Sequence, residues 1–278
     1  MLKIPDAPNA LYKGYELRSI LGPSAIRQMS HNFAWVYPKF DQENFIKEAK
    51  ANIETLSLSQ RSEHIAGIMH KYLPQNYYQA IQVITDALTD PLQKTANNGL
   101  AVMFYMPHCN FVALYGIDPK YNAGKDPFDC SMQAQYQLTK RFTCEYSIRP
   151  FIVSQPARTL DYLYQWMLDK DPHVRRLCSE GTRPRLPWSK KIDSFIKDPS
   201  AGIEILEQLK DDEDLYVRRS VANHLGDIAK DHLELALKIA YQWLEGASRE
   251  RKWIIRHALR YPDKIGIKKA QELRKLAK

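Results

Sequence analysis

One run of residues, from Asp171 to Trp188, concentrates side chains that could do chemistry. It holds one tryptophan, Trp188, one glutamate, Glu180, and four arginines at 175, 176, 183 and 185. Its first half recurs at Asp214–Asn223, 43 residues later when counted from Val174 to Val217. Arginines bind phosphate oxygens, and a carboxylate beside them can stabilise positive charge or accept a proton. The pattern predicts a surface that holds a polyanion and does chemistry next to it.

A polar pair recurs at equivalent positions of three successive repeats when Val174, Val217 and Ile254 are aligned. The pairs are Arg176/Glu180, Arg219/Asn223 and Arg256/Arg260, and Asp227 lies one further turn beyond Asn223. Each pair alone could be an ordinary i, i+4 contact, which contributes only about 0.2–0.5 kcal/mol on an isolated helix. Recurrence in three units favours a common face of the array over three unrelated contacts.

Two further groups flank this run. Glu145 belongs to a segment that we expect to be helical up to Pro150, just before the first complete repeat. A glutamate there is ordinarily solvated, but here it could meet the polar face of the next unit. Trp188 follows two prolines and two arginines, which favour a position at a rim, although core packing is the usual fate of a tryptophan. An exposed indole could stack on a base or sugar.

The elements that position these residues are all predicted to be helical, because apolar residues recur at helical spacing and strand-like alternation is rare. Proline disfavours helix in the preceding residue, so Pro74, Pro91, Pro107 and Pro150 are interpreted as boundaries. The resulting helices are 42–57, 58–73, 75–90, 92–106 and 130–149, with a loop at 117–129. The aromatic-rich residues 1–40 are expected to dock on these helices.

From residue 160 the chain alternates first and second helices. The expected helices are 160–168 and 174–180, then 203–209 and 217–229, then 235–244 and 253–260. Helix pairs that recur every 40 residues or so are typical of HEAT-like solenoids. We therefore predict a single all-α domain, 1–278, whose curved array has a concave polar and basic face. Its segments are 1–40, 41–116, core repeats at 130–262 and a basic helix at 263–278.

Net charge is +8, and residues 249–278 carry eleven Lys or Arg against three acids, which is also +8. The basic end could bind nucleic acid or an acidic partner, although a solvated helix end is an equally ordinary explanation.

The four cysteines form no C-x-x-C pair, which argues against a zinc site or a disulfide framework. No apolar run is long enough for a membrane span. An intracellular, cytoplasmic protein is expected.

Several runs resemble the bacterial DNA alkylation repair family of HEAT-like DNA glycosylases, of the AlkC/AlkD type, and most of all its AlkC branch. The resembling runs are 106–116, 138–145, 148–152, 173–188, 216–231 and 253–260, and together they cover roughly residues 95–262. The most specific is 173–188, with its Arg-Arg, Glu-Gly and Arg-Pro-Arg-Leu-Pro-Trp sequence.

The resemblance implies monofunctional excision of cationic alkylated bases, such as N3-methyladenine, from duplex DNA by a monomer that uses no metal or cofactor. Carried onto this chain, the catalytic acids are Glu145 and Glu180, and the lesion contact is Trp188, to which we add Tyr146. The backbone-gripping residues are Arg176, Arg183 and Asp227, the last acting through an arginine or a water. An immunoglobulin-like domain that some relatives carry is expected to be absent.

The implied chemistry agrees with the residues. Alkylation leaves a positive charge on the base, and cleavage of the glycosidic bond builds oxocarbenium character at the sugar, which a nearby carboxylate stabilises. The alternative is a non-catalytic HEAT-repeat protein that binds unusual DNA structures or acts as a protein scaffold, since that fold is often a scaffold. Release of free base distinguishes the two.

Overall fold

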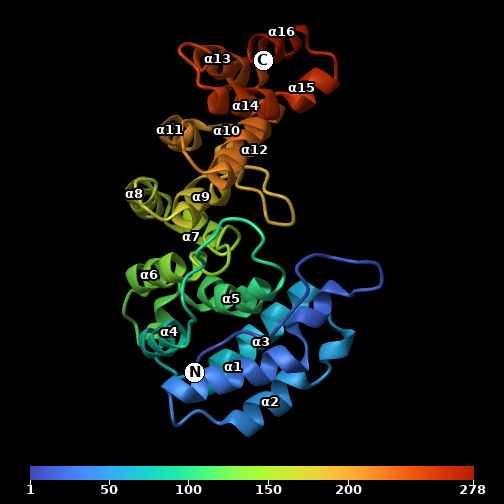
Figure 1. The fold of residues 1–278 in the computed structure, drawn as a ribbon. Coiled ribbons are helices and arrows are strands. Elements are labelled where there is room, and N and C mark those ends of the chain that lie inside the picture. The colour runs from blue at the N-terminus through green and yellow to red at the C-terminus, as the bar shows by residue number, and fades with distance from the viewer. The chain divides into compact units, whose positions relative to one another are not determined.

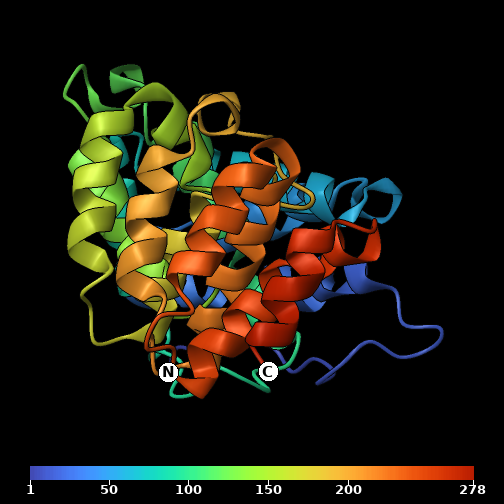
Figure 2. The same ribbon diagram turned by 90° about the horizontal axis from the view of Figure 1, so that it is seen from above.

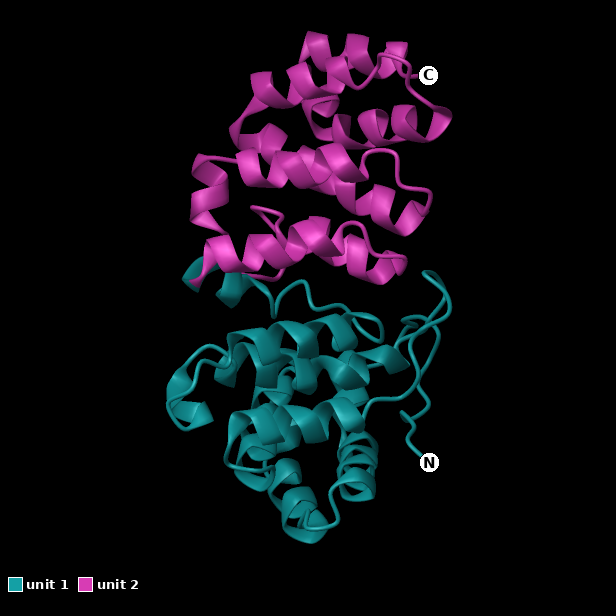
Figure 3. Ribbon diagram, turned by 90° about the vertical axis from the view of Figure 1, so that its left-hand side faces the viewer, with its two compact units in different colours: residues 1–154 teal, residues 155–278 magenta.

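The computed structural model describes all 278 residues, and its regular elements are α-helices and short 3-10 helices with no strand. The predicted all-α fold is confirmed. The chain separates into two compact units, unit 1 (residues 1–154) and unit 2 (residues 155–278), which Figure 3 colours separately. We describe each unit by itself, and the single domain and its curvature stay predictions.

Unit 1 contains seven α-helices around an aromatic core. They are α1 (Pro23–Val36), α2 (Gln42–Lys50), α3 (Leu58–Tyr72), α4 (Tyr77–Asp86), α5 (Met106–Tyr115), α6 (Phe128–Thr139) and α7 (Arg149–Ser154). Helix α5 packs against α3 and α6 (Figure 1). The core rings include Phe33, Phe45, Phe104, Phe111 and Phe128, all essentially inaccessible to solvent. Phe33 comes from the first forty residues, so part of that segment does dock through its aromatics.

Two predicted helices of unit 1 are wrong, and in both cases a proline that was expected to end a helix lies in the first turn of the next one. The helix expected at 92–106 is absent, since only a 3-10 turn forms at Ala101–Tyr105, and α5 then begins with Pro107 in its first turn. The helix expected at 130–149 ends at Thr139, and Pro150 lies in the first turn of α7. Proline lacks an N–H, and the first turn of a helix needs none. These prolines start helices rather than end them.

Unit 2 confirms the predicted helix pairs. The pairs are α8 (Pro156–Trp166) with α9 (Pro172–Gly181), α11 (Ser200–Leu209) with α12 (Leu215–Asp231), and α13 (Leu233–Gln242) with α14 (Arg249–Ala258). Short helices α10 (Asp193–Lys197), α15 (Arg260–Lys264) and α16 (Lys268–Leu276) complete the unit. The second helix α12 packs against both α9 and α14. In Figure 2 the helices coloured yellow to red form a staggered row.

Local sequence sets where the second helices α9, α12 and α14 begin and, for α12, which face is buried. Asp171, Asp214 and Ser248 are their N-caps, and each side chain accepts a backbone N–H of the first turn. Such caps satisfy donors that the helix itself leaves free. On α12 an apolar stripe, Val217, Val221, Leu225 and Ile228, is at most 1% exposed. Burial of that stripe fixes the rotation of α12 and therefore the direction of its polar stripe.

Candidate active site

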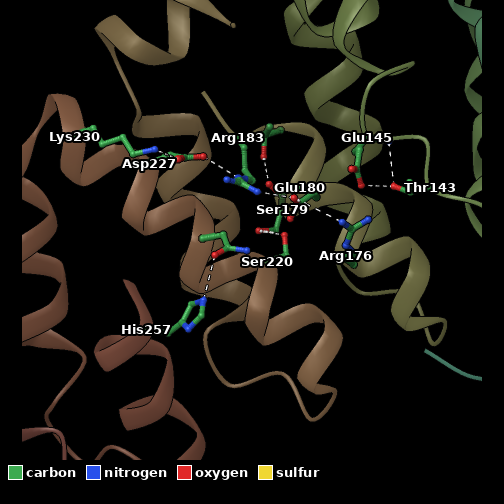
Figure 4. Close-up of polar contacts among 12 residues, drawn as sticks. Thr143, Glu145, Arg176, Ser179, Glu180, Arg183, Ser220, Asp227, Lys230 and His257 are labelled. Carbon is green, nitrogen blue, oxygen red and sulfur yellow. Dashed lines mark hydrogen bonds and ion pairs between the residues drawn. The ribbon is translucent and has the colours of Figure 1, made fainter. Parts of the chain in front are cut away.

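Glu180 lies in the last turn of α9 and is only 5% exposed. Its Oε1 is 2.6 Å from Arg183 Nη1 and 3.6 Å from Arg176 Nη2 (Figure 4). The guanidinium of Arg176 also lies over the Tyr216 ring, 4.6 Å from its centroid. The i, i+4 contact is therefore present, but it is one part of a larger buried cluster.

Opposing effects act on the Glu180 carboxyl. Burial raises its pKa, because a charged group loses solvation inside the protein. The positive charges of Arg176 and Arg183, with hydrogen bonds from Ser220 and Arg183, lower it more. The net pKa lies below the ordinary value of 4.5. Glu180 is thus a buried carboxylate that stays ionised at neutral pH.

Arg183 connects α9 to α12 through a chain of alternating charges. Its Nε donates to Asp227 Oδ2 at 2.8 Å, and Lys230 Nζ donates to Asp227 Oδ1 at 2.9 Å (Figure 4). Asp227 is 2% exposed and Arg183 is 7% exposed. Unlike Glu180, Asp227 touches cations on both of its oxygens. It holds Arg183 in place and thereby orients the Glu180 carboxylate.

Sequence reasoning missed three residues behind this cluster. The hydroxyls of Ser179 and Ser220 lie 3.0 Å apart, and Ser220 also hydrogen-bonds the Glu180 carboxylate. His224 is fully buried, and burial lowers its pKa to about 4. Only the repeat alignment could have drawn attention to Ser220, because it follows Arg219 as Leu177 follows Arg176. Serine at that position is a polar residue where the preceding repeat has an apolar one.

Glu145 belongs to unit 1, in the irregular segment between α6 and α7. Its carboxylate accepts a hydrogen bond from the Thr143 hydroxyl, and its N–H donates to Thr143 Oγ1 at 3.4 Å (Figure 4). This short-range turn, rather than the predicted helix, sets the direction of the side chain. Glu145 is partly exposed. Its carboxylate is therefore accessible and held by a neighbour.

Tyr146, next to Glu145, directs its hydroxyl into unit 1, where it donates to the Met106 carbonyl at 3.0 Å. Burial raises the pKa of the Tyr146 hydroxyl well above the ordinary value.

Trp188, in contrast to Tyr146, is fully exposed in the loop between α9 and α10, and its backbone has a φ of 60°. A large side chain at positive φ is uncommon. This exposure matches the rim position that the sequence predicts, and the lesion-contact roles of both aromatics remain proposals.

Of the other predicted DNA-binding residues, Asn223 and Arg260 are in contact on the polar stripe of α12, whereas Arg256 is not part of that stripe. Arg219 lies on α12, and Asn223 Oδ1 accepts from Arg260 Nη2 at 3.0 Å and from His257 Nε2 at 3.2 Å. Arg256 instead donates to the Ala277 carbonyl and closes the end of α16. Arg260 begins α15 rather than ending α14, which corrects the predicted helix 253–260. Arg260 nevertheless reaches the polar stripe of α12.

The chain has neither a group of metal-binding side chains nor a membrane-spanning helix. No three His, Cys, Asp or Glu side chains are grouped so that they could hold a metal ion. None of the helices combines the length and the apolar character that crossing a membrane requires. The groups that unit 2 brings together are an ionised carboxylate, arginines and serine hydroxyls.

Comparison with known proteins places these residues in a family, although no family model matches the chain. The chain is 35% identical over 259 residues to "Uncharacterized protein YhaZ" of Bacillus subtilis, which covers 93% of the chain and 68% of that relative. It is 36% identical, with a TM-score of 0.80, to the structure of Pseudomonas fluorescens alkylpurine DNA glycosylase AlkC bound to DNA containing an abasic site analog. That match covers 94% of this chain and 68% of the other. The chain belongs to the AlkC branch of the HEAT-like DNA glycosylases.

Proposed function

We propose that this protein is a monofunctional DNA glycosylase that hydrolyses the N-glycosidic bond of alkylated, cationic bases such as N3-methyladenine in duplex DNA. The observation that carries the proposal is Glu180, a buried carboxylate kept ionised by Arg176 and Arg183. The similarity to an alkylpurine DNA glycosylase bound to DNA supports it.

The proposed reaction breaks the bond between C1′ and the base nitrogen. The bonding electrons leave with the base and neutralise its positive charge, while C1′ becomes electron-poor. A preorganised carboxylate stabilises that oxocarbenium character, and a water adds to C1′ and releases its proton to the solvent. We assign the stabilising role to Glu180 and give Glu145, which is more exposed, the orientation of the attacking water. Trp188 and Tyr146 are assigned to the surroundings of the lesion.

The arginines serve the DNA backbone in this proposal. Contacts to phosphates position a protein on the duplex without reading its sequence. Arg176 and Arg183 lie beside Glu180, and the ion pair with Asp227 fixes the orientation of Arg183. The phosphates flanking the lesion would thereby set where the carboxylate meets the sugar.

The test is release of free base from methylated duplex DNA. We expect the wild-type protein to release 3-methyladenine, and Glu180→Gln to lose about a hundredfold in single-turnover rate, as loss of a preorganised electrostatic group commonly does. Glu145→Gln is expected to lose rate as well. Binding of both variants to a duplex with an abasic-site analogue should be unchanged, since the arginines remain.

A matched control is Glu213→Gln, which neutralises an exposed carboxylate of unit 2 in the loop before α12. It should excise at the wild-type rate. No base release by folded wild-type protein would contradict the proposal and favour a non-catalytic DNA-binding protein. Equal losses of binding and excision in Glu180→Gln would contradict a catalytic role for that residue.

The monofunctional character has its own readout. A monofunctional enzyme leaves an abasic site in an intact strand, whereas a lyase forms a Schiff base that borohydride traps on the protein. We expect strand breaks only after alkali treatment of the product, and no trapped adduct. A trapped adduct would show that an amine takes part.

A further inference from the structure

A second cluster in unit 2 surrounds Asn223 and brings three of the predicted DNA-binding residues together with a histidine that the sequence did not single out. It consists of Arg219, Asn223, His257 and Arg260, which we call the Asn223 cluster, and it joins α12, α14 and α15. His257 points toward α12 below Ser220 in Figure 4. Three side chains that can carry positive charge therefore gather around one neutral amide.

The cluster has no negative charge of its own. Arg260 donates to two neutral oxygens, Asn223 Oδ1 at 3.0 Å and the His257 carbonyl at 2.7 Å. Arg219 makes no hydrogen bond or ion pair. By contrast, neighbouring arginines of this unit are matched by carboxylates: Arg175 by Asp212, Arg183 by Asp227 and Arg251 by Asp211. Burial lowers the pKa of Arg260, and the Asp227 carboxylate acts to raise it without forming an ion pair with Arg260. Arginines that are not paired with a carboxylate can bind an anion.

The pKa of His257 responds both to burial and to these arginines. Burial lowers its pKa most, and Arg260, Arg219 and Arg274 lower it further, to about 4. Trp253 stacks on the ring from within α14, 4.8 Å between centroids, and the carboxylate of Asp263 is paired with Arg274. The ring is therefore neutral at pH 7. Its Nε2–H donates to Asn223 Oδ1, so a second proton would go to Nδ1.

We propose that the Asn223 cluster binds a DNA backbone phosphate and that His257 takes up one proton when the phosphate arrives. The inference rests on the proposed function only in taking duplex DNA as the ligand. A phosphodiester carries one negative charge, which offsets the field of Arg219 and Arg260 at the imidazole. The ring then gains a proton that it lacks in the free protein, and protonated imidazole strengthens the attraction for the phosphate.

Proton uptake by His257 makes DNA affinity depend on pH. The pKa of His257 is about 4 in the free protein and higher in the complex. DNA affinity is therefore highest at low pH and falls as pH rises through the pKa of the complex. Each unit by which the phosphate raises that pKa contributes about a tenfold gain in affinity at acid pH. We expect about a tenfold loss of affinity between pH 5.5 and 7.5 beyond that of a variant that cannot titrate at this position.

The experiment is calorimetric titration of the full chain with an unmodified duplex at pH 6, in two buffers whose ionisation enthalpies differ. Wild type is expected to take up about one proton per duplex bound more than His257→Gln does, because glutamine keeps a donor for Asn223 but does not titrate. The control is His31→Gln, a histidine on α1 in unit 1, which should behave as wild type. Because this duplex contains no alkylated base, the result is independent of excision.

Three results would overturn the inference: duplex binding without proton uptake by wild type, equal uptake in His257→Gln, or uptake driven by inorganic phosphate alone but not by DNA. The last would show a site for free phosphate instead of the backbone. If His257→Gln does not fold, Arg219→Gln serves, since it changes a residue outside the apolar stripe of α12. It should weaken duplex binding, and titration of the His257 Cε1 proton by NMR should show a higher pKa in the free protein.

Discussion

At the residue scale, the central feature is how Glu180 is held. Its carboxylate meets Arg176 from its own helix, Arg183 from the following loop and Ser220 from α12. An ionised carboxylate that was buried without these partners would cost several kcal/mol, so the partners are a condition for the charge. Ser220 is a positioning residue on this view, because it acts through Glu180.

Ser220→Ala should therefore change the pH dependence of excision more than the fold. The Ser220 hydroxyl is one of the groups that lower the pKa of Glu180, so that pKa should rise when the hydroxyl is removed. Because the carboxylate is active only when ionised, the acid limb of the rate profile should move to higher pH. Single-turnover rates from pH 4 to 8 test this.

The control for that measurement is Ser200→Ala, an exposed serine at the start of α11. Its profile should superimpose on that of wild type. A uniform fall in rate for Ser220→Ala, with no movement of the acid limb, would mean that the hydroxyl supports packing rather than the ionisation of Glu180.

At the element scale, α12 is the central helix of unit 2. It packs against its own first helix α11, against α9 and α14 on either side, and against α13. It also supplies Ser220, Asn223 and Asp227, so the same helix builds the core and both polar clusters. Damage to its apolar stripe should therefore act on stability first.

Leu225→Ala is predicted to lower the free energy of unfolding by about 2–5 kcal/mol, the usual cost of deleting a buried leucine side chain. Leu225 is fully buried in the stripe of α12. Leu215→Ala, at the exposed first position of the same helix, should cost less than about 0.5 kcal/mol. Denaturant unfolding measures the free energy of unfolding of both variants. Similar losses of that free energy would show that the stripe is not the core of this unit.

Helix α5 gives unit 1 a built-in acid sensitivity through His108. Its ring is buried among Phe33, Phe104 and Tyr105, and burial lowers its pKa to about 3. Below pH 6.5 the unfolded chain binds a proton at this histidine and the folded protein does not, so stability falls as pH falls from 6.5 towards 3. The loss from this one residue between pH 7 and pH 5 is about 2 kcal/mol.

His108→Phe should remove that part of the acid slope, because phenylalanine keeps an aromatic ring in the core and does not titrate. Thermal unfolding at pH 7 and pH 5 tests it. The variant should lose less stability than wild type on going to pH 5. His31→Gln, which changes an exposed ring, should keep the wild-type slope. An unchanged slope in His108→Phe would place the acid sensitivity elsewhere.

At the scale of the whole molecule, positive charge is segregated at the C-terminal end. Arg251 and Lys269 there pair with Asp211 and Glu234, which lie earlier in the chain. Lys264, Lys268 and Lys275 have no carboxylate partner. Such unpaired lysines attract a phosphate backbone at long range and release counterions when they bind it.

The triple variant Lys264→Gln, Lys268→Gln and Lys275→Gln should weaken duplex binding and flatten its salt dependence. Every phosphate that the variant no longer neutralises reduces the slope of log K against log salt by about 0.9. The control neutralises three lysines of unit 1, Lys13, Lys39 and Lys47, and so changes net charge equally. Equal slopes in the two triple variants would mean that net charge alone matters, and not where it lies.

Local sequence determined much of this protein. The helix pairs of unit 2, the N-caps Asp171, Asp214 and Ser248, and the apolar stripe of α12 all follow from helical spacing and capping preferences, which act within a few residues. The exposure of Trp188 followed from its neighbours as well. Local spacing failed at Pro107 and Pro150, since a proline marks a helix boundary without saying whether the helix begins or ends there.

Only the tertiary structure decided which polar groups meet. Arg183 bonds Asp227 across 44 positions of the sequence, and His257 reaches Asn223 across 34. Periodicity places each side chain on a face of its own helix, but the partner depends on how neighbouring helices stack and on which rotamer the core allows. Arg256 shared the register of Arg176 and still turned to the end of α16. The polar residues of each repeat were therefore readable in the sequence, whereas the ionised carboxylate of Glu180 and the Asn223 cluster arose from packing.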